Sequence, residues 1–332
     1  MTSPLRLFLL TVLLAGCATR PTEPVVQNPV PEQPLPAGPY TPGVSYFGRD
    51  SYIEYIAGNA PIIFTAPHGG SLNPAEIPDR TAAACGGSAI ITTDLNTAEL
   101  ARSMQQRYFA KFGRYPHVVI MHLSRRKLDA NRTDPEASCG NGRAGATLAQ
   151  WHAFIDAAKS AALTSSPRAW YMDVHGHRHA IDRLELGYLL TRDQLDLSDE
   201  SLDAGATYED KASVTTLSRA APASFSELLR GPHSLGSLYA AGGFRSIPSS
   251  ADPRPAGDAY FSGGDNTRRH TCGSEATPFG GVSGGNVCGV QLEANLAGVR
   301  DTPANRDRFG DVTALVLQQF LSRHWGLVLD PQ

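Results

Sequence analysis

The chain alternates short apolar runs with longer segments in which apolar residues recur at helical spacing. The apolar runs are rich in β-branched residues and predict strands over residues 61–66, 117–121, 169–174, 186–190 and 287–292. Apolar positions three or four residues apart predict helices over residues 94–112, 147–163 and 305–324. This alternation predicts a single α/β domain with a mixed, mostly parallel sheet and helices on both faces.

The N-terminal part of the chain has a different pattern. An apolar run over residues 7–14 follows Arg6, and the residues Leu14-Ala15-Gly16-Cys17 close it. The run is too short for a permanent membrane helix, and a small-residue cleavage site follows it. This arrangement resembles a bacterial lipoprotein signal, which implies a signal peptide over residues 1–16 and a lipid on Cys17. The alternative is an ordinary secretory signal with an incidental cysteine.

A proline-rich segment follows. Eight prolines lie between Pro21 and Pro42, with Glu, Gln, Asn and Thr among them. A segment of this composition cannot bury a core, and it favours an extended tether of about 3.1 Å per residue. We therefore expect a tether over residues 17–44 and one large domain over residues 45–332. The chain is expected to be an exported lipoprotein, anchored in a bacterial membrane and facing the periplasm or the cell surface.

Charge and cysteine content narrow the class of protein. The net charge of −3 and the absence of a basic stripe in the sequence give no reason to expect nucleic acid as a partner. Cys85, Cys139, Cys272 and Cys288 form an even set in an exported chain, so disulfides are expected, with three possible connectivities. A Gly-rich loop between Cys272 and Cys288 is easily closed, which favours that pair and leaves Cys85 with Cys139. A four-cysteine zinc site is the alternative, but the sequence has no CxxC.

Histidines and carboxylates follow three of the predicted strands. His68 precedes two glycines, Asp173, His175 and His177 alternate onto one face, and Glu293 ends the last strand. Ligands bind at the carboxyl ends of strands in such sheets. A catalytic zinc takes three protein ligands and keeps one position open, while a separate carboxylate acts as the general base. The pattern therefore favours a metal site, although the sequence contains neither HExxH nor GxSxG.

Residues 60–325 resemble the N-formylglutamate amidohydrolase-like family and, more distantly, the poly-γ-glutamate hydrolases and zinc carboxypeptidases. The resemblance is carried by Ala66-Pro-His-Gly-Gly70, Leu128-Asp-Ala-Asn-Arg132, Asp173-Val-His-Gly-His177, and Gln291-Leu-Glu293 followed by Arg300. It implies a zinc carboxypeptidase-like fold and one Zn²⁺ ion held by His68, His175 and an acidic residue.

The acidic ligand has two candidates. Asp94 begins the run Asp94-Leu-Asn-Thr-Ala-Glu-Leu-Ala101, which is similar to the run that carries the acidic ligand of the poly-γ-glutamate hydrolases. Asp94 lies 26 positions after His68, whereas in those enzymes the acidic residue follows the first histidine closely. Glu76 is therefore an alternative ligand. Asp94 could also be a helix N-cap that accepts the amide of Thr97.

The resemblance also assigns roles around the metal. Glu293 is expected to be the catalytic base. Asn131 and Arg132 are expected to clamp a substrate carboxylate, since the planar guanidinium of arginine pairs with a carboxylate through two bonds. Arg300 is a further candidate for substrate binding. Asp173 and His177 are expected to support the metal ligands from behind.

These expectations together describe a zinc-dependent amidohydrolase that cleaves an amide bond near a carboxylate. Its substrate would be a small carboxylate-bearing amide or peptide, and the membrane would be a partner through the lipid anchor. One alternative is a non-catalytic ligand-binding lipoprotein on the same fold. Another is a different metallohydrolase, such as a deacetylase or a phosphoesterase.

Overall fold

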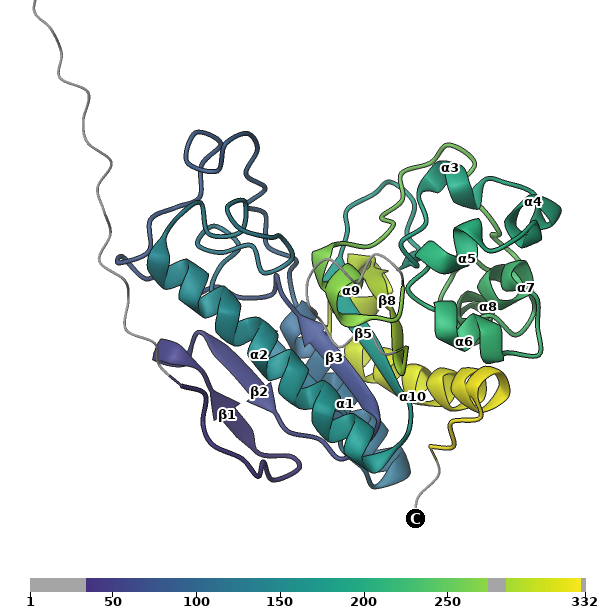
Figure 1. The fold of residues 1–332 in the computed structure, drawn as a ribbon, viewed down its shortest axis with the longest axis horizontal. Coiled ribbons are helices and arrows are strands. Elements are labelled where there is room, and N and C mark those ends of the chain that lie inside the picture. The colour runs from purple at the N-terminus through teal and green to yellow at the C-terminus, as the bar shows by residue number, and fades with distance from the viewer. Residues whose placement is uncertain (1–33, 274–284, 330–332) are drawn as a thin grey trace, which may run out of the picture.

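An eight-stranded mixed sheet forms the centre of one α/β domain (Figure 1). The computed structural model describes residues 34–273 and 285–329, so Cys17 and the expected signal peptide lie outside the described residues. The strand order is β1-β2-β4-β3-β5-β8-β6-β7. The strands are β1 (Ser45–Phe47), β2 (Ile53–Ile56), β3 (Ile62–Ala66), β4 (His117–Met121), β5 (Ala169–Gly176), β6 (Leu184–Gly187), β7 (Ser246–Ile247) and β8 (Val287–Ala294).

The central strands β4, β3, β5 and β8 run parallel to one another. On one side β2 pairs antiparallel with β4, and on the other side β6 pairs antiparallel with β8. The expected single α/β domain with a mixed sheet is therefore confirmed. Because the central strands are parallel, their carboxyl ends open at the same edge of the sheet, and loops from β3, β5 and β8 meet there.

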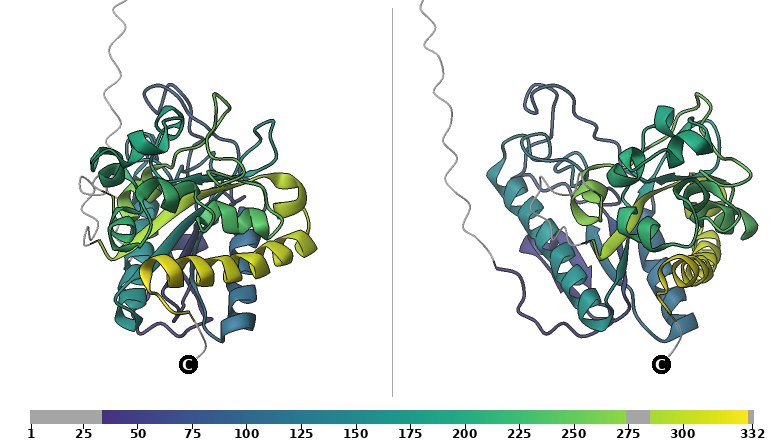
Figure 2. Two further views of the ribbon diagram at one scale, coloured as in Figure 1. Left: turned by 90° about the vertical axis from the view of Figure 1, so that its right-hand side faces the viewer. Right: turned by 45° about the vertical axis from the view of Figure 1, so that its right-hand side comes forward.

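Helices cover both faces of the sheet (Figures 1 and 2). The helices of the described residues are η1 (Arg49–Ser51), α1 (Thr97–Phe112), α2 (Gly142–Ser165), α3 (Arg192–Leu195), α4 (Asp199–Asp203), α5 (Thr207–Lys211), α6 (Thr215–Ala220), α7 (Phe225–Arg230), α8 (Leu235–Ala241), α9 (Asp265–His270), η3 (Leu296–Arg300) and α10 (Pro303–Trp325). Helices α1 and α10 pack together against one face, and α2 covers the other.

Alternation along the strands divides the core into two clusters. Phe64, Met172 and Leu292 belong to the cluster that includes α1 and α10. Ile63 and Tyr171 belong to the cluster on the α2 side. Side chains of a strand point to opposite faces in turn, so odd-numbered positions of β3, β5 and β8 face α2. Towards the carboxyl ends of these strands, the odd-numbered positions change from apolar to polar.

The observed elements differ from the predicted ones at several boundaries. The five predicted strands and three predicted helices are present, but the strand expected over residues 186–190 is Leu184–Gly187. It ends early because Leu189 has a φ of 65°, which is incompatible with an extended strand. The short strands β1, β2 and β7 and the short helices α3–α8 carry too few periodic positions for the sequence pattern to reveal them.

The domain begins before the boundary expected at residue 45. Leu35 and Tyr40 pack against the core on the α2 side, and the rings of Tyr40 and Tyr55 meet edge to face at 5.1 Å. The amide of Gly43 donates to the carbonyl of Ala57 at 2.8 Å. A proline-rich composition does not prevent single aromatic residues from docking, and here the last part of the expected tether packs on the domain.

Two disulfides connect Cys85 with Cys139 and Cys272 with Cys288. This is the pairing that the Gly-rich loop favoured, and it leaves no cysteine of the described residues for a four-cysteine zinc site. Within residues 34–273 and 285–329, no helix has the length and apolar content needed to cross a bilayer.

Candidate metal centre

The carboxyl ends of β3 and β5 bring two buried histidines together. His68 follows β3 and His175 lies near the end of β5, and their ring centres are 4.8 Å apart. The chain after His68 passes close to the start of α1, because a Cβ at Gly69 would lie only 2.7 Å from the amide nitrogen of Ala98. Glycine is therefore required at this approach.

Both histidines direct Nδ1 towards the same carboxylate oxygen. His68 Nδ1 lies 3.4 Å from Asp94 Oδ2, and His175 Nδ1 lies 3.3 Å from that atom. His68 Nδ1 is buried and has no hydrogen-bond partner in the described structure. One ligand atom from each of the three residues lies within 4.8 Å of the other two. Two nitrogens and one oxygen at this spacing match the donor set of a zinc site.

The other nitrogen of each histidine is held by a second carboxylate. His68 Nε2 lies 2.7 Å from Asp129 Oδ1, and His175 Nε2 lies 2.8 Å from Asp173 Oδ2. A carboxylate behind a metal-binding histidine fixes the ring and its tautomer and increases its basicity. Asp173 therefore lies where it was expected. Asp129 is its counterpart behind His68, and sequence reasoning did not assign it this role.

The electrostatics of the cluster follow from three buried carboxylates around two imidazoles. Burial opposes the charge of Asp94, but the rings of His175 and His68 beside it hold the pKa of this carboxyl below its ordinary value. Burial likewise opposes an imidazolium at His175, yet Asp173 and Asp94 raise its pKa well above the ordinary value. For Asp129, the contact with His68 outweighs burial and keeps the pKa of the carboxyl low. Part of this negative charge is paired within the protein, since Arg125 Nε donates to Asp129 Oδ2 at 2.9 Å and Arg125 Nη1 lies 4.0 Å from Asp94 Oδ1.

Asp94 reaches the cluster because the long connection after β3 returns to its starting point. The amide of Asp94 donates to the carbonyl of His68 at 3.0 Å. Helix α1 begins only at Thr97, and its N-cap residue is Asn96, with a φ of 63° and no capping side-chain bond. The amide of Thr97 donates to the backbone carbonyl of Asp94 at 3.3 Å and not to its side chain, so the carboxylate is free to face the histidines.

Glu293 lies in the same row of side chains, one strand away. In the sheet register His175 is opposite Glu293, so both side chains point to the α2 face. Gln291 Nε2 donates to Glu293 Oε1 at 2.8 Å. Burial raises the pKa of Glu293 to about 8. A nearby cation would favour its ionised form, and a carboxyl that exchanges a proton near neutral pH is suited to general acid–base chemistry.

A cavity of about 170 Å³ connects these groups with the expected substrate clamp. Its lining includes Asn131, Arg132 and Glu293 together with the three candidate ligands. The amide of Asn131 is held by its neighbours, since Oδ1 accepts the backbone N–H of Asn266 at 2.8 Å. Arg132 donates to the carbonyl of Asn131 at 2.7 Å and its side chain is 27% exposed. Arg132 is therefore the member of the pair that can reach a ligand.

The structure does not bring Glu76, the alternative ligand, to the cluster. Its side chain is 49% exposed and accepts a hydrogen bond from the hydroxyl of Tyr52 at 2.7 Å. Spacing along the sequence favoured Glu76 because it is nearer to His68. The fold reverses this preference, since the intervening loop carries Glu76 outward before the chain returns at Asp94.

Arg300 and His177 also differ from their expected roles. Arg300 is 2% exposed, and its guanidinium donates to the carbonyls of Ala294 at 2.9 Å and His177 at 3.2 Å, and also to the carbonyl of Leu95. These bonds tie three segments together and occupy all three nitrogens of the group. His177 bonds through Nε2 to the carbonyl of Arg183 at 2.7 Å rather than supporting His175, because β5 ends at Gly176 and the chain turns away.

Comparisons with known proteins give a fold-level likeness. No family model matches the sequence, and no curated protein matches it. Among solved structures, the chain is similar to N-formylglutamate amidohydrolase from Ralstonia eutropha JMP134, with 12% identity, a TM-score of 0.46, and coverage of 83% of this chain and 99% of that one. It is also similar to a gene product of Agrobacterium tumefaciens, with 12% identity, a TM-score of 0.45, and coverage of 82% and 95%. We therefore infer a metal centre from the geometry of the side chains described above and not from these likenesses.

Proposed function

We propose that this protein is a zinc-dependent hydrolase whose metal ligands are His68, Asp94 and His175. The observation that carries the proposal is the direction of the two rings: each presents Nδ1 to Asp94, while a buried carboxylate holds each Nε2. The unpartnered Nδ1 of His68 supports it, because a buried nitrogen without a partner is costly unless something binds it. Two imidazoles and one carboxylate suit Zn²⁺ and leave a position open for substrate.

When bound, Zn²⁺ would polarise a scissile carbonyl and lower the pKa of a coordinated water. The chain supplies the remaining chemistry. Glu293 accepts a proton from the attacking water and returns it to the leaving group, which is consistent with its raised pKa. The side-chain amide of Asn131 lies 3.3 Å from Nε2 of His175 and lines the cavity, and Arg132 binds a carboxylate of the substrate.

We further propose that the scissile bond is an amide close to a carboxylate, in a small amide or peptide. The positive charge of Arg132 favours a substrate that carries a carboxylate. The acid form of Glu293 can protonate a leaving nitrogen, which hydrolysis of an amide requires. The two disulfides are consistent with an exported protein. Export and a lipid on Cys17 remain proposals, and Cys17→Ser should release the chain from membranes without changing turnover.

Metal content and turnover, measured on the same preparations, test the proposal. His175→Ala should lose both zinc and activity, because one of three ligands is gone. Asp94→Asn and Glu76→Gln form a matched pair, and only the first should lose metal. Retention of zinc and turnover in Asp94→Asn would contradict the ligand set. Assays on amides and phosphate esters in parallel would separate an amidohydrolase from a phosphoesterase, and bound zinc without turnover on either would favour a binding protein.

A further inference from the structure

A second group of potential metal ligands lies beside the proposed zinc centre. His177 and His179 follow β5, and Glu185 lies in β6. One ligand atom from each of these residues lies within 4.8 Å of the other two. In the sheet register Glu293 is opposite His175 on one side and opposite Glu185 on the other. Glu185 therefore lies one strand beyond Glu293, whereas His177 and His179 lie in the connection from β5 to β6.

The carboxylate of Glu185 is buried and has little to balance its charge. Its side chain is 0% exposed, and among the described residues its ion-pair partner is His179, with Nδ1 2.8 Å from Oε1. The guanidinium of the neighbouring Arg183 points elsewhere, with Nη1 3.3 Å from Oδ2 of Asp252. A buried carboxylate is costly unless it is paired. The backbone N–H of Phe261 donates to Oε2 at 2.8 Å, which fixes the carboxylate and leaves Oε1 on the side of the histidines.

The ring of His177 has a hydrogen bond at each nitrogen. Nε2 bonds to the carbonyl of Arg183 at 2.7 Å, so Nε2 carries the hydrogen and Nδ1 carries the lone pair. The backbone N–H of His179 is the group that donates to this Nδ1, at 3.1 Å. A carbonyl behind a histidine is a common way to orient a metal ligand. A cation would have to displace only this one bond to reach His177.

A cavity gives access to the group. It has a volume of about 240 Å³, and His177, His179 and Phe261 contribute to its lining. Phe261 stacks on the ring of His179, with 4.6 Å between ring centres, and so restricts its rotation. Asp94 also lines this cavity and the cavity of the zinc centre, so the two cavities adjoin. An ion from solvent can therefore approach the histidines without opening the fold.

We propose that His177, His179 and Glu185 bind a second divalent transition-metal ion of the Zn²⁺ class. Two imidazoles and one carboxylate are ligands that zinc and its neighbours prefer over magnesium or calcium. The two groups of ligands have no residue in common. The second ion ties the connection between β5 and β6 to the sheet. Because the ligands converge only in the folded chain, the ion stabilises the folded state.

Zinc counting tests this proposal independently of activity. Tag-free protein is stripped with a chelator, loaded with excess Zn²⁺, desalted, and analysed by mass spectrometry for zinc per chain. The expected result is two ions for the wild type and for the control His233→Ala, which changes an exposed histidine. His179→Ala and Glu185→Gln should each retain one ion, with far-UV circular dichroism unchanged. Glu185→Gln keeps the side-chain shape and covers the case in which His179→Ala fails to fold.

The outcomes separate this site from the zinc centre. A wild type that retains one ion, with no further loss in His179→Ala, would overturn the second site. Two ions that persist in both His179→Ala and Glu185→Gln would also overturn it. If His175→Ala keeps two ions while His179→Ala drops to one, the ligand set of the proposed function fails and the second site stands. In the His175→Ala background, Zn²⁺ should still raise the melting temperature, and adding His179→Ala should abolish that rise.

Discussion

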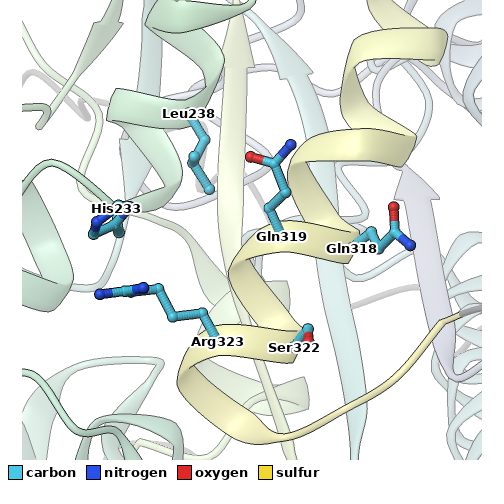
Figure 3. Close-up of a pocket in the computed structure, with 6 residues that line it drawn as sticks. All are labelled: His233, Leu238, Gln318, Gln319, Ser322 and Arg323. Carbon is cyan, nitrogen blue, oxygen red and sulfur yellow. The ribbon is translucent and has the colours of Figure 1, made fainter.

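Two cavities of the described structure differ in size and in chemistry. The larger one, about 490 Å³, lies between α8 and α10 (Figure 3) and is lined by His233, Leu238, Gln318, Gln319, Ser322 and Arg323. The smaller one, about 170 Å³, lies at the carboxyl ends of β3, β5 and β8 and contains the proposed zinc ligands. The larger cavity has almost three times the volume, but every residue that lines it is exposed or half-buried.

We place the proposed site in the smaller cavity because buried polar groups converge there, and not because of its volume. Polar side chains around the larger cavity are solvated, and no carboxylate is among its lining residues. In the smaller cavity, histidines and carboxylates with perturbed pKa values face one another away from water. Burying such groups is costly, and groups of this kind cluster at functional sites, which supports the proposed function. The following experiments test this contrast.

The largest effect is expected at Glu293. Glu293→Gln keeps the shape of the side chain and leaves the three metal ligands untouched, so zinc content should not change. The rate should fall by about 10²–10⁴-fold, because the general base is lost. Turnover and metal content measured on one preparation check this. Unchanged turnover would remove the proposed base and with it the claim that the smaller cavity is catalytic.

The next effect concerns the carboxylate behind His68. Asp129→Asn should lower zinc affinity by about 10–100-fold, because the ring of His68 loses the partner that orients it. Competition with a chromogenic chelator measures the affinity. Asp193→Asn, at a residue whose side chain is 83% exposed, is the matched control and should leave the affinity unchanged. Equal affinities for the two variants would show that the Asp129 contact is only structural.

A pair of arginine variants compares the two cavities directly. Arg132→Ala should lower kcat/KM by about 10–100-fold for substrates with a carboxylate near the scissile bond, the loss expected for one charge-assisted bond. A substrate without that carboxylate should be affected far less. Arg323→Ala, in the larger cavity, should leave kcat/KM unchanged for both kinds of substrate. A comparable loss for Arg323→Ala would move substrate binding to α8 and α10.

The smallest effect concerns a histidine that is buried without a carboxylate beside it. Burial lowers the pKa of His117 to about 3, and its Nδ1 accepts bonds from Tyr55 at 2.8 Å and Gly58 at 3.0 Å. Between pH 6.5 and 3 the unfolded chain therefore binds a proton at this site and the folded chain does not. Stability is complete above about pH 6.5 and should fall by up to about 1.4 kcal/mol per pH unit below it.

Urea unfolding at pH 7, 5.5 and 4.5 measures this slope, with His117→Gln as the comparison. The variant should show a shallower slope because it has no proton to bind at this position. An identical slope would assign the acid sensitivity to other groups. The pKa of His175 shifts in the opposite direction, because its carboxylate neighbours raise it despite burial.

Sequence patterns predicted the long helices and the central strands better than the short helices. Helices α1 and α10 have 16 and 23 residues, enough periodic positions to identify them, whereas α3–α8 have four to seven residues each and leave no clear period. The strand-end motifs indicated that His68 and His175 would meet, because carboxyl ends of parallel strands share one edge. No sequence pattern indicated that Asp129 would lie behind His68 or that the loop would carry Glu76 outward.

Local patterns were enough to predict the α/β alternation, the favoured cysteine pairing and the strands whose ends carry histidines and carboxylates. These properties depend on local spacing and composition, which a single chain displays directly. Three features became visible in the folded chain: Asp94 rather than Glu76 faces the histidines, Arg300 bonds to backbone carbonyls, and His177 lies near Glu185. Each of these outcomes depends on how a loop returns to the sheet, and loop paths are set by long-range packing and hydrogen bonds that no local pattern encodes.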